Sequence, residues 1–372
     1  MSYKSVFSSE KDVVLAVNEI KQKATEIVNP GLVIYFASPA YGVDEISSLM
    51  ADAFPTAQTV GCSSAGEMVE GKMLSGSIVA MICGQDSIPN LKVEILENIK
   101  ENKQAVAKAF KNFEGHFNTP MSQISALKYV GIVLIDGQTR CEEYINDQIG
   151  NLTNVTFVGG SAAANSITDP TYIFVNGKSY TNAAALVLME AVNGFTFLKT
   201  QSLSLTDKKL IPTKVDESTR TVFEFNDKPA SKVYADALGV SEDELLNYAT
   251  RNPLGLVLDE DHFFVRDPHC ILENGAMDFF CSVKEGVELT VLQARDIVVD
   301  TRRDLATVFS KNQDLKAIIE FNCVTRVIEL SENGKSDKYA SLFEPTPTIS
   351  FGTFGESYIG HMNQTSTMLL LK

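Results

Sequence analysis

The sequence lacks the marks of several protein classes. Its six cysteines are scattered and form no CxxC pair, so neither a zinc cage nor a disulfide framework is indicated. No run of ~18 consecutive apolar residues occurs, and the N-terminus has no apolar stretch as long as a signal-peptide core. We therefore expect a cytoplasmic protein whose cysteines are reduced and are mostly small core residues.

Positive charge and phosphate-binding motifs are also scarce. Lys and Arg total 32 against 47 Asp and Glu, and the net charge of -15 repels nucleic acid and anionic lipid. The sequence contains no G-x-x-x-x-G-K-[ST], no G-x-G-x-x-G after a strand and no G-x-S-x-G. These features argue against nucleic-acid and membrane partners, a nucleotide cradle and a serine-hydrolase site.

The composition is that of a globular chain. With 372 residues, 44% of them hydrophobic, we expect two or three domains. Residues 1–29 are expected to hold an N-terminal helix, since apolar residues recur there at helical spacing: Val13, Val17, Ile20, Ala24 and Ile27. Ser9 and Asp12 resemble a capping box at its start.

A βαββ pattern follows and recurs along the chain. In the first copy, "LVIYFAS" and "AQTVGCSSAGE" are strands around the helix "VDEISSLMADAF", and "SIVAMIC" is the last strand. An ungapped alignment of the chain with itself that matches Ile34 to Ile132 also matches "VGCSSAGE" to "VGGSAAAN". A weaker third copy contains "KAIIEFNC", "TISFGTFGE" and "NQTSTMLLL", and Thr-Arg ends both "IDGQTR" and "FNCVTR". We therefore predict an α/β fold with mixed sheets, built from duplicated βαββ units.

Between the second and third copies, the pattern is that of an inserted antiparallel α+β segment. The segments "GFTFLKTQSLSL" and "TRTVFEFN" alternate apolar and polar residues, as antiparallel strands do. Two short helices follow, and Ser241 and Glu244 form a capping box at the start of the second. A meander then runs from "PLGL" to "VLQA". We place the boundary near Phe225. After the N-terminal helix, this gives two interlocked domains, residues 30–225 and 226–372.

The glycine-bearing turns are the candidate site. Gly61, Gly66, Gly159 and Gly160 either let backbone amides approach a ligand or only permit close packing of neighbouring strands. Because related units carry these turns, we expect them to converge on one region and line a pocket. Cys62 is also the candidate nucleophile of an alternative, thiol-dependent enzyme, although no histidine is close to it in the sequence.

Five motifs in register resemble the FIST family, bacterial sensory proteins with an N-terminal and a C-terminal FIST domain. They are "VGCSSAGE", "FVGGSAAAN", "PLGL…FFVRDP", "FNCVTR" and "FGTFGE…HMNQT". The sequence departs from the family pattern at Asn165, where members often carry an acid, and at Met362, which splits a His-Asn pair. The fold implied is two FIST domains that hold their ligand between them.

The resemblance implies a non-enzymatic small-molecule sensor. The resemblance covers no output domain, so such a sensor would signal through a partner protein such as a histidine kinase. A homodimer is also possible. One branch resembles haem-based nitric oxide sensors, while other members are thought to sense amino acids or similar metabolites. A structural adaptor whose turns bind nothing is a further alternative.

Haem would need one axial histidine. His361 lies beside the third turn and is the first candidate; His262 and His269 are alternatives, because "FFVR" between them offers ring contacts and a propionate partner. His116 follows a helix in a polar loop and is the weakest candidate. The alternative for each of them is a hydrogen-bonded structural residue, which is the commoner role of a lone histidine.

A metabolite would need charged groups. Arg140 and Arg326 suit a carboxylate, and Glu67 or Glu356 suits an ammonium group. Ion pairing among these residues is the alternative explanation. The other residues expected to line the ligand site belong to the same turns: Cys62, Ser63, Gly160, Ser161, Asn165 and Asn363.

Overall fold

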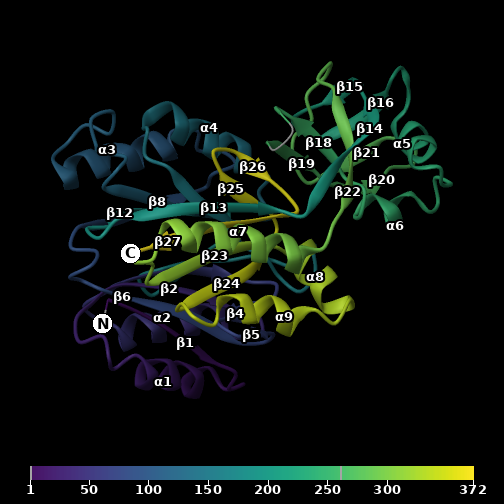
Figure 1. The fold of residues 1–372 in the computed structure, drawn as a ribbon. Helices are drawn as coiled ribbons and strands as arrows, with labels where there is room; N and C mark the ends of the chain where they lie inside the picture. The colour runs from purple at the N-terminus through teal and green to yellow at the C-terminus, as the bar shows by residue number, and fades with distance from the viewer. Residues whose placement is uncertain (1, 260–261) are drawn as a thin grey trace. The chain divides into compact units, whose positions relative to one another are not determined.

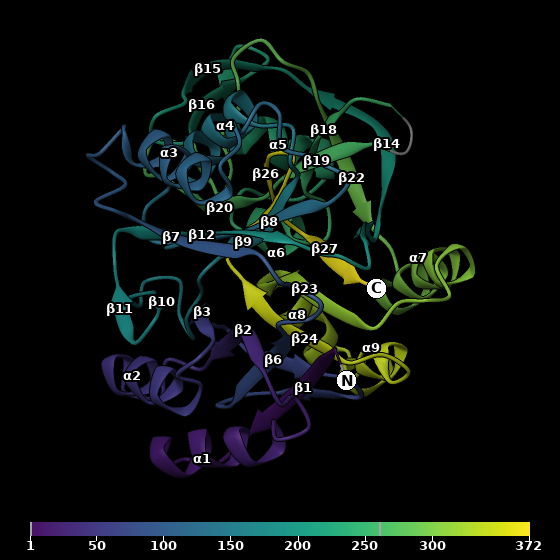
Figure 2. The same cartoon turned by 90° about the vertical axis from the view of Figure 1, so that its left-hand side faces the viewer.

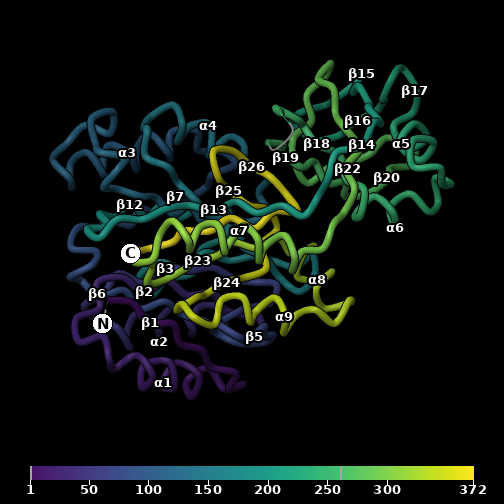
Figure 3. Tube along the Cα trace, viewed as in Figure 1, coloured from purple at the N-terminus to yellow at the C-terminus, as the bar shows by residue number. Residues whose placement is uncertain are grey.

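The computed structural model describes residues 2–259 and 262–372, which form two compact units. Unit 1 comprises the described residues up to Thr200, then Arg302–His361 and Ser366–Lys372; unit 2 comprises Gln201–Thr301 and Met362–Thr365. Figure 3 traces the chain out of unit 1 at the end of β13 (Phe195–Gln201) and back within α7 (Ile297–Lys311). Glu260 and Asp261, in the predicted meander, lie outside the described residues.

Unit 1 contains three repeats of a β-α-β-α-β-β-β-β pattern (Figure 1). The first repeat is β1 (Tyr3–Ser8), α1 (Val13–Lys23), β2 (Pro30–Ala37), α2 (Val43–Ala53), β3 (Gln58–Ser63), β4 (Glu67–Val69), β5 (Lys72–Leu74) and β6 (Ile78–Gly84). The second is β7 (Leu91–Glu97), α3 (Ala105–Phe117), β8 (Tyr129–Ile135), α4 (Glu142–Leu152), β9 (Phe157–Ser161), β10 (Ile173–Val175), β11 (Lys178–Tyr180) and β12 (Ala183–Glu190).

The third repeat is interrupted by unit 2. It consists of β13, α7, β23 (Ala317–Cys323), α8 (Val324–Glu332), β24 (Thr348–Thr353), β25 (Glu356–Tyr358), β26 (His361–Met362) and β27 (Thr365–Leu371). Between α8 and β24 it adds α9 (Ser336–Ala340) and the short 3-10 helix η1 (Ser341–Phe343). The predicted α/β class and the recurrence of βαββ units are confirmed.

Each repeat also begins with a strand and a helix that the prediction did not include in the unit. Residues 1–29 were predicted as a helix, but β1 precedes α1 and pairs with β6. Polar residues interrupt the apolar ones in "YKSVFS", without regular alternation, so its strand signal is weaker than that of the continuous apolar runs. Asp12 caps α1 by accepting the Leu15 N–H at 3.0 Å.

The three repeats exchange hairpins. Their six-stranded sheets share one order: β1-β6-β2-β3-β10-β11, β7-β12-β8-β9-β25-β26 and β13-β27-β23-β24-β4-β5. The hairpin of the first repeat joins the third sheet, that of the second joins the first, and that of the third joins the second. The exchange is cyclic, so each sheet of unit 1 is completed by strands from another repeat.

The inner faces of the three sheets share one hydrophobic core. Within this core, the ring centroids of Phe36 from the first repeat and Phe351 from the third repeat lie 4.3 Å apart. Helices α1 and α2 cover the outer face of the first sheet, and α3 and α4 cover that of the second (Figure 2). Burial of these apolar faces removes them from water and stabilises the fold through the hydrophobic effect.

Two of the repeated glycines are required by strand packing. A Cβ at Gly61 would lie 2.0 Å from the Tyr35 carbonyl oxygen, and one at Gly159 would lie 1.7 Å from the Val133 carbonyl oxygen. These distances are far below van der Waals contact. Of the two alternatives, ligand approach and close strand packing, the structure therefore supports close strand packing for Gly61 and Gly159.

Unit 2 is an antiparallel α+β segment, as predicted. One sheet has the order β14-β22-β18-β19, from Leu203–Leu210, Leu289–Ala294, Leu254–Val257 and Phe263–Arg266. The other has β15-β16-β21-β20, from Pro212–Asp216, Thr221–Phe225, Met277–Phe279 and Pro268–Ile271, with β17 (Lys228–Pro229) beside β16. Helices α5 (Ala230–Leu238) and α6 (Leu245–Ala249) complete it. The predicted boundary near Phe225 falls inside this unit, at the end of β16.

None of the described helices combines the length and the apolar character that crossing a membrane requires.

Candidate functional site

The turns after β3, β9 and β24 contact one another, as the repeat argument predicted. Their backbone hydrogen bonds are Ala65 N–H to the Gly352 carbonyl (3.1 Å), Ser161 N–H to the Gly355 carbonyl (2.8 Å) and Ala163 N–H to the Ser63 carbonyl (3.0 Å). These amides therefore join the repeats to one another. Because these amides already donate hydrogen bonds within the fold, they are not available to a ligand.

The first turn is packed inside unit 1. The Cys62 side chain belongs to the shared core, and burial raises the pKa of its thiol well above the usual value. A buried neutral thiol is a poor nucleophile, so this geometry gives the thiol-enzyme alternative no support. The Ser63 hydroxyl oxygen accepts the Tyr172 N–H at 3.0 Å and so anchors the hairpin of the second repeat.

Glu67, at the start of β4, is a buried carboxyl with three hydrogen-bond donors. The Ser77 amide and hydroxyl donate to Oε2 at 3.1 and 2.7 Å, and the Ser64 hydroxyl donates to Oε1. Burial raises the pKa of Glu67 to about 7, although these hydrogen bonds act in the opposite direction. The predicted ammonium-binding role of Glu67 stays a prediction.

The second turn makes a different set of polar and backbone contacts. The Ser161 hydroxyl donates to Oε1 of the buried Glu142 at 3.0 Å, and Gly160 lies opposite Glu356 in the β9–β25 ladder. Asn165 and Arg140 are exposed, and Arg140 has a left-handed φ of 54°. The turn thus brings Gly160, Ser161 and Glu356 together.

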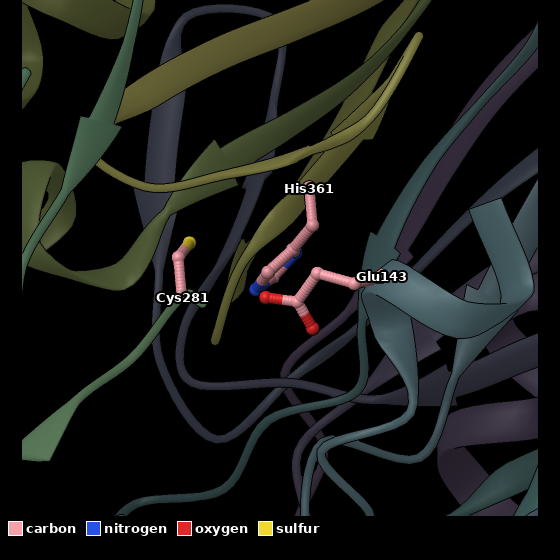
Figure 4. Close-up of side chains that lie close together, drawn as sticks. All are labelled: Glu143, Cys281 and His361. Carbon is pink, nitrogen blue, oxygen red and sulfur yellow. The ribbon is translucent and has the colours of Figure 1, made fainter. Parts of the chain in front are cut away.

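His361 is buried against the third turn (Figure 4). A Cβ at Gly355 would lie 2.2 Å from the His361 Cε1 atom, so only glycine leaves room for the ring in this position. The Glu143 carboxylate points toward the imidazole, and a ring nitrogen and a carboxylate oxygen lie within 4.8 Å of each other. Cys281, also drawn in Figure 4, belongs to unit 2, where its thiol donates to Asn363 Oδ1 at 2.7 Å.

These surroundings fit haem poorly. An axial histidine must face an apolar space that accommodates the macrocycle, whereas the His361 ring lies on the Gly355 backbone beside a carboxylate. Cavities of 500, 390 and 280 Å³ on the described part of unit 1 have no histidine in their linings.

The other histidines are partnered by polar side chains. His262 is exposed and its Nδ1 lies 2.7 Å from Asp259, and His116 Nε2 lies 3.1 Å from Asn90 Oδ1. His269 Nδ1 lies 2.8 Å from Asp278 Oδ2.

The outer face of the third sheet carries a carboxyl group at a position where the first two sheets carry none. Phe36, Leu134 and Phe321 point into the shared core from the central strands. The residues before them therefore lie on the outer faces: Tyr35, Val133 and Glu320. A carboxyl group thus occupies a position that is aromatic in the first repeat and aliphatic in the second.

Glu320 is the centre of a buried polar cluster. The hydroxyls of Tyr339 and Ser366 both donate to its Oε1 at 2.5 Å, and Arg326 Nε donates to Asn322 Oδ1 at 2.9 Å. All five side chains are buried. Within the described part of the chain, Glu320 Oε2 accepts no hydrogen bond.

The cluster has opposing effects on protonation. Burial raises the pKa of Glu320, whereas the hydrogen bonds from Ser366 and Tyr339 and the charge of Arg326 oppose that rise. Burial also raises the pKa of Tyr339 far above its usual value, with the Glu320 charge acting in the same direction. Tyr339 is therefore a neutral hydrogen-bond donor.

Sequence reasoning selected Arg326 but missed Glu320 and Tyr339. The available signal was the single acidic residue inside the apolar strand "KAIIEFNC". The Thr-Arg match with Arg140 was misleading: Ile135 lies on an outer face and Phe321 on the inner face, so the two motifs are not in equivalent register. Accordingly, Arg140 is exposed while Arg326 is buried.

Family comparison agrees with this architecture. The model of the FIST N domain matches residues 31–228, and that of the FIST C domain matches residues 230–358. The chain belongs to the FIST family. FIST domains are small-ligand sensory domains of signalling proteins, so the predicted resemblance and its sensory role are confirmed at that level. Glu320, Arg326 and Tyr339 all lie in the FIST C match.

Other comparisons add little to the FIST assignment. Among proteins of curated function, none matches the sequence. Among solved structures, T. maritima PurL complexed with FGAR aligns over 99% of this chain and 72% of its own, with 11% identity and a TM-score of 0.21. A likeness at that level supports no conclusion about fold or function.

Proposed function

We propose that this FIST protein senses a small polar metabolite, of the amino-acid type, at the buried polar cluster of the third repeat. We further propose that it relays ligand occupancy to a separate signalling protein such as a histidine kinase. In this proposal the chain performs no chemistry on its ligand.

The observation that carries the proposal is the Glu320 carboxyl group. It is fully buried, and its Oε2 has no hydrogen-bond partner among the described residues. Such an oxygen costs ~1–3 kcal/mol of stability, so its retention suggests a role in binding. An ammonium group of a ligand would supply the missing donor, and a guanidinium such as that of Arg326 suits a carboxylate.

Entry of a ligand requires part of the third repeat to move. Glu320 and Tyr339 are buried to the same extent as the core, and α8 and α9 lie between β23 and β24 in the chain. Helix α9 and η1 have no counterpart in the first two repeats. We expect the α8–α9 segment to open for the ligand, and a partner would detect that displacement.

A binding assay with matched variants tests the proposal. The purified chain is screened against the amino acids by thermal shift, and stabilising compounds are then titrated calorimetrically. Arg326→Gln and Glu320→Gln should each weaken binding by about 30-fold or more, since each removes a charge-assisted interaction. Tyr35→Phe, at the corresponding position of the first repeat, should leave affinity unchanged. Equal affinity in all variants would contradict the proposed site.

Haem-based nitric oxide sensing stays a prediction from the resemblance. A visible spectrum tests it. A Soret band that nitric oxide shifts and that His361→Ala abolishes would favour haem, with His262→Ala and His269→Ala reporting on the two alternative ligands. A chain that remains colourless after haem reconstitution would remove this branch and leave the metabolite proposal standing.

A further inference from the structure

The β20–β21 hairpin of unit 2 gathers three side chains with different metal-ligating atoms. A ring nitrogen of His269, the Cys270 sulfur and an Asp278 carboxylate oxygen all lie within 4.8 Å of one another. None of them belongs to the cluster around Glu320 or to the turns of unit 1. Nothing in the FIST assignment calls for this grouping.

A β-bulge brings the three together. In the ladder, Pro268 faces Phe279 and Cys270 faces Asp278, so His269 is an additional residue on its strand. Neighbouring side chains on a regular strand point to opposite faces, but a bulge redirects one of them. His269 and Cys270 can therefore both approach Asp278.

The surroundings allow an ion to enter. The His269 side chain is 29% exposed and the Asp278 side chain 10% exposed, and Cys270 is partly exposed. The Phe280 ring lies 4.6 Å from the His269 ring, centre to centre, and forms an apolar wall beside the imidazole. The cluster is thus partly shielded from water and still reachable.

The donor set discriminates among cations. Mg²⁺ and Ca²⁺ prefer oxygen ligands, whereas thiolate and imidazole together favour zinc-like ions. Tetrahedral zinc with bonds of about 2.0–2.3 Å separates its donors by ~3.5 Å, a spacing that small side-chain rotations can reach from the present positions. A carboxylate, a thiolate and a neutral imidazole would also neutralise the dication.

We propose that His269, Cys270 and Asp278 form a binding site for a zinc-like divalent metal ion, with water as a fourth ligand. Binding converts the Cys270 thiol to a thiolate and releases its proton to solvent. The ion replaces the hydrogen bond between His269 and Asp278 and holds β20 to β21. The competing explanation is a His–Asp hydrogen bond with a cysteine nearby that binds no metal.

Cobalt(II) provides a direct test, since it reports both stoichiometry and the nature of its ligands. Titration of the purified chain with Co²⁺ should give one equivalent of a thiolate-to-cobalt charge-transfer band that Zn²⁺ displaces. Cys270→Ser should abolish the band, and His269→Gln or Asp278→Asn should weaken Zn²⁺ affinity by about 100-fold or more. His262→Gln, in a similar His–Asp pair, and Cys281→Ser should retain the band.

A second measurement uses the unmodified chain, in case a variant folds poorly. Alkylation of Cys270 by iodoacetamide, mapped by mass spectrometry, should be slowed by stoichiometric Zn²⁺ and restored by a chelator. A charge-transfer band that survives Cys270→Ser, or alkylation of Cys270 at the same rate with and without Zn²⁺, would overturn the proposal.

Discussion

The pH dependence of stability should be governed in part by Glu67. Burial raises the pKa of this carboxyl to about 7 from an ordinary value of 4.5. Between these values, the folded chain keeps a proton that the unfolded chain has lost, so the free energy of unfolding falls as pH rises. Below pH 4.5 both states are protonated and the effect vanishes, while above pH 7 it is complete. The full difference amounts to about 3 kcal/mol.

Glu67→Gln should remove this dependence. The glutamine oxygen can accept from Ser77 and its amide can donate to Ser64 Oγ, so the hydrogen bonds of the protonated carboxyl are reproduced. We expect the variant to be ~2–3 kcal/mol more stable than the parent at pH 8 and nearly equal at pH 5.

Urea denaturation at both pH values, followed by far-ultraviolet circular dichroism, provides the measurement. The sequence contains no tryptophan, so intrinsic indole fluorescence is not an option. Glu244→Gln is the control: hydrogen bonds from Ser241 lower the pKa of that exposed carboxyl, so its replacement should not stabilise the chain at pH 8. If Glu67→Gln lost stability at pH 8, the ionised carboxylate would be stabilising and the reasoning would be refuted.

Three further outcomes follow from the packing. Gly159→Ala should cost about 3 kcal/mol of stability, measured by urea denaturation, because its Cβ would lie 1.7 Å from the Val133 carbonyl oxygen; a neutral effect would contradict the packing role. Gly150→Ala, in α4 with no atom near the added methyl, should instead stabilise the chain by ~1 kcal/mol. In native protein, Cys62 should resist thiol reagents that modify Cys270, because it is buried and its thiol pKa is raised; rapid labelling of Cys62 would reopen the thiol-enzyme alternative.

The sequence predicts the strands and helices of unit 1 well because their signals are local. Continuous apolar runs mark β2, β8 and β23, and glycine-bearing turns mark the ends of the strands that pair with them. The contacts among those turns were also predicted, because related units were expected to point their turns toward one region. By contrast, β1 and β13 were missed as members of the repeat. Polar residues interrupt the apolar pattern of β1, and the alternation of β13 continues into β14, so β13 was assigned to the inserted segment.

The hairpin exchange could not be predicted. Met68, Phe174 and Ser357 pair across to Ser350, Gly61 and Gly159 of other repeats. Three similar sheet edges are available to each hairpin, and the choice depends on how the repeats pack around the shared core. No local pattern distinguishes them.

The site was only partly predictable for a related reason. Arg326 was named from a motif, whereas Glu320 and Tyr339 meet it only after α8 and α9 fold against the third sheet. The same holds for His269 and Asp278, which a bulge and a hairpin bring together. Contacts of this kind depend on register and curvature that spacing in the sequence does not define.

The most direct test of the proposed sensor is hydrogen exchange of the full chain with and without a stabilising amino acid. We predict that protection is concentrated in peptides covering residues 317–343, which carry Glu320, Arg326 and Tyr339, and that it is lost in Arg326→Gln. Protection confined to other segments, or unchanged in that variant, would contradict a ligand site on the third repeat.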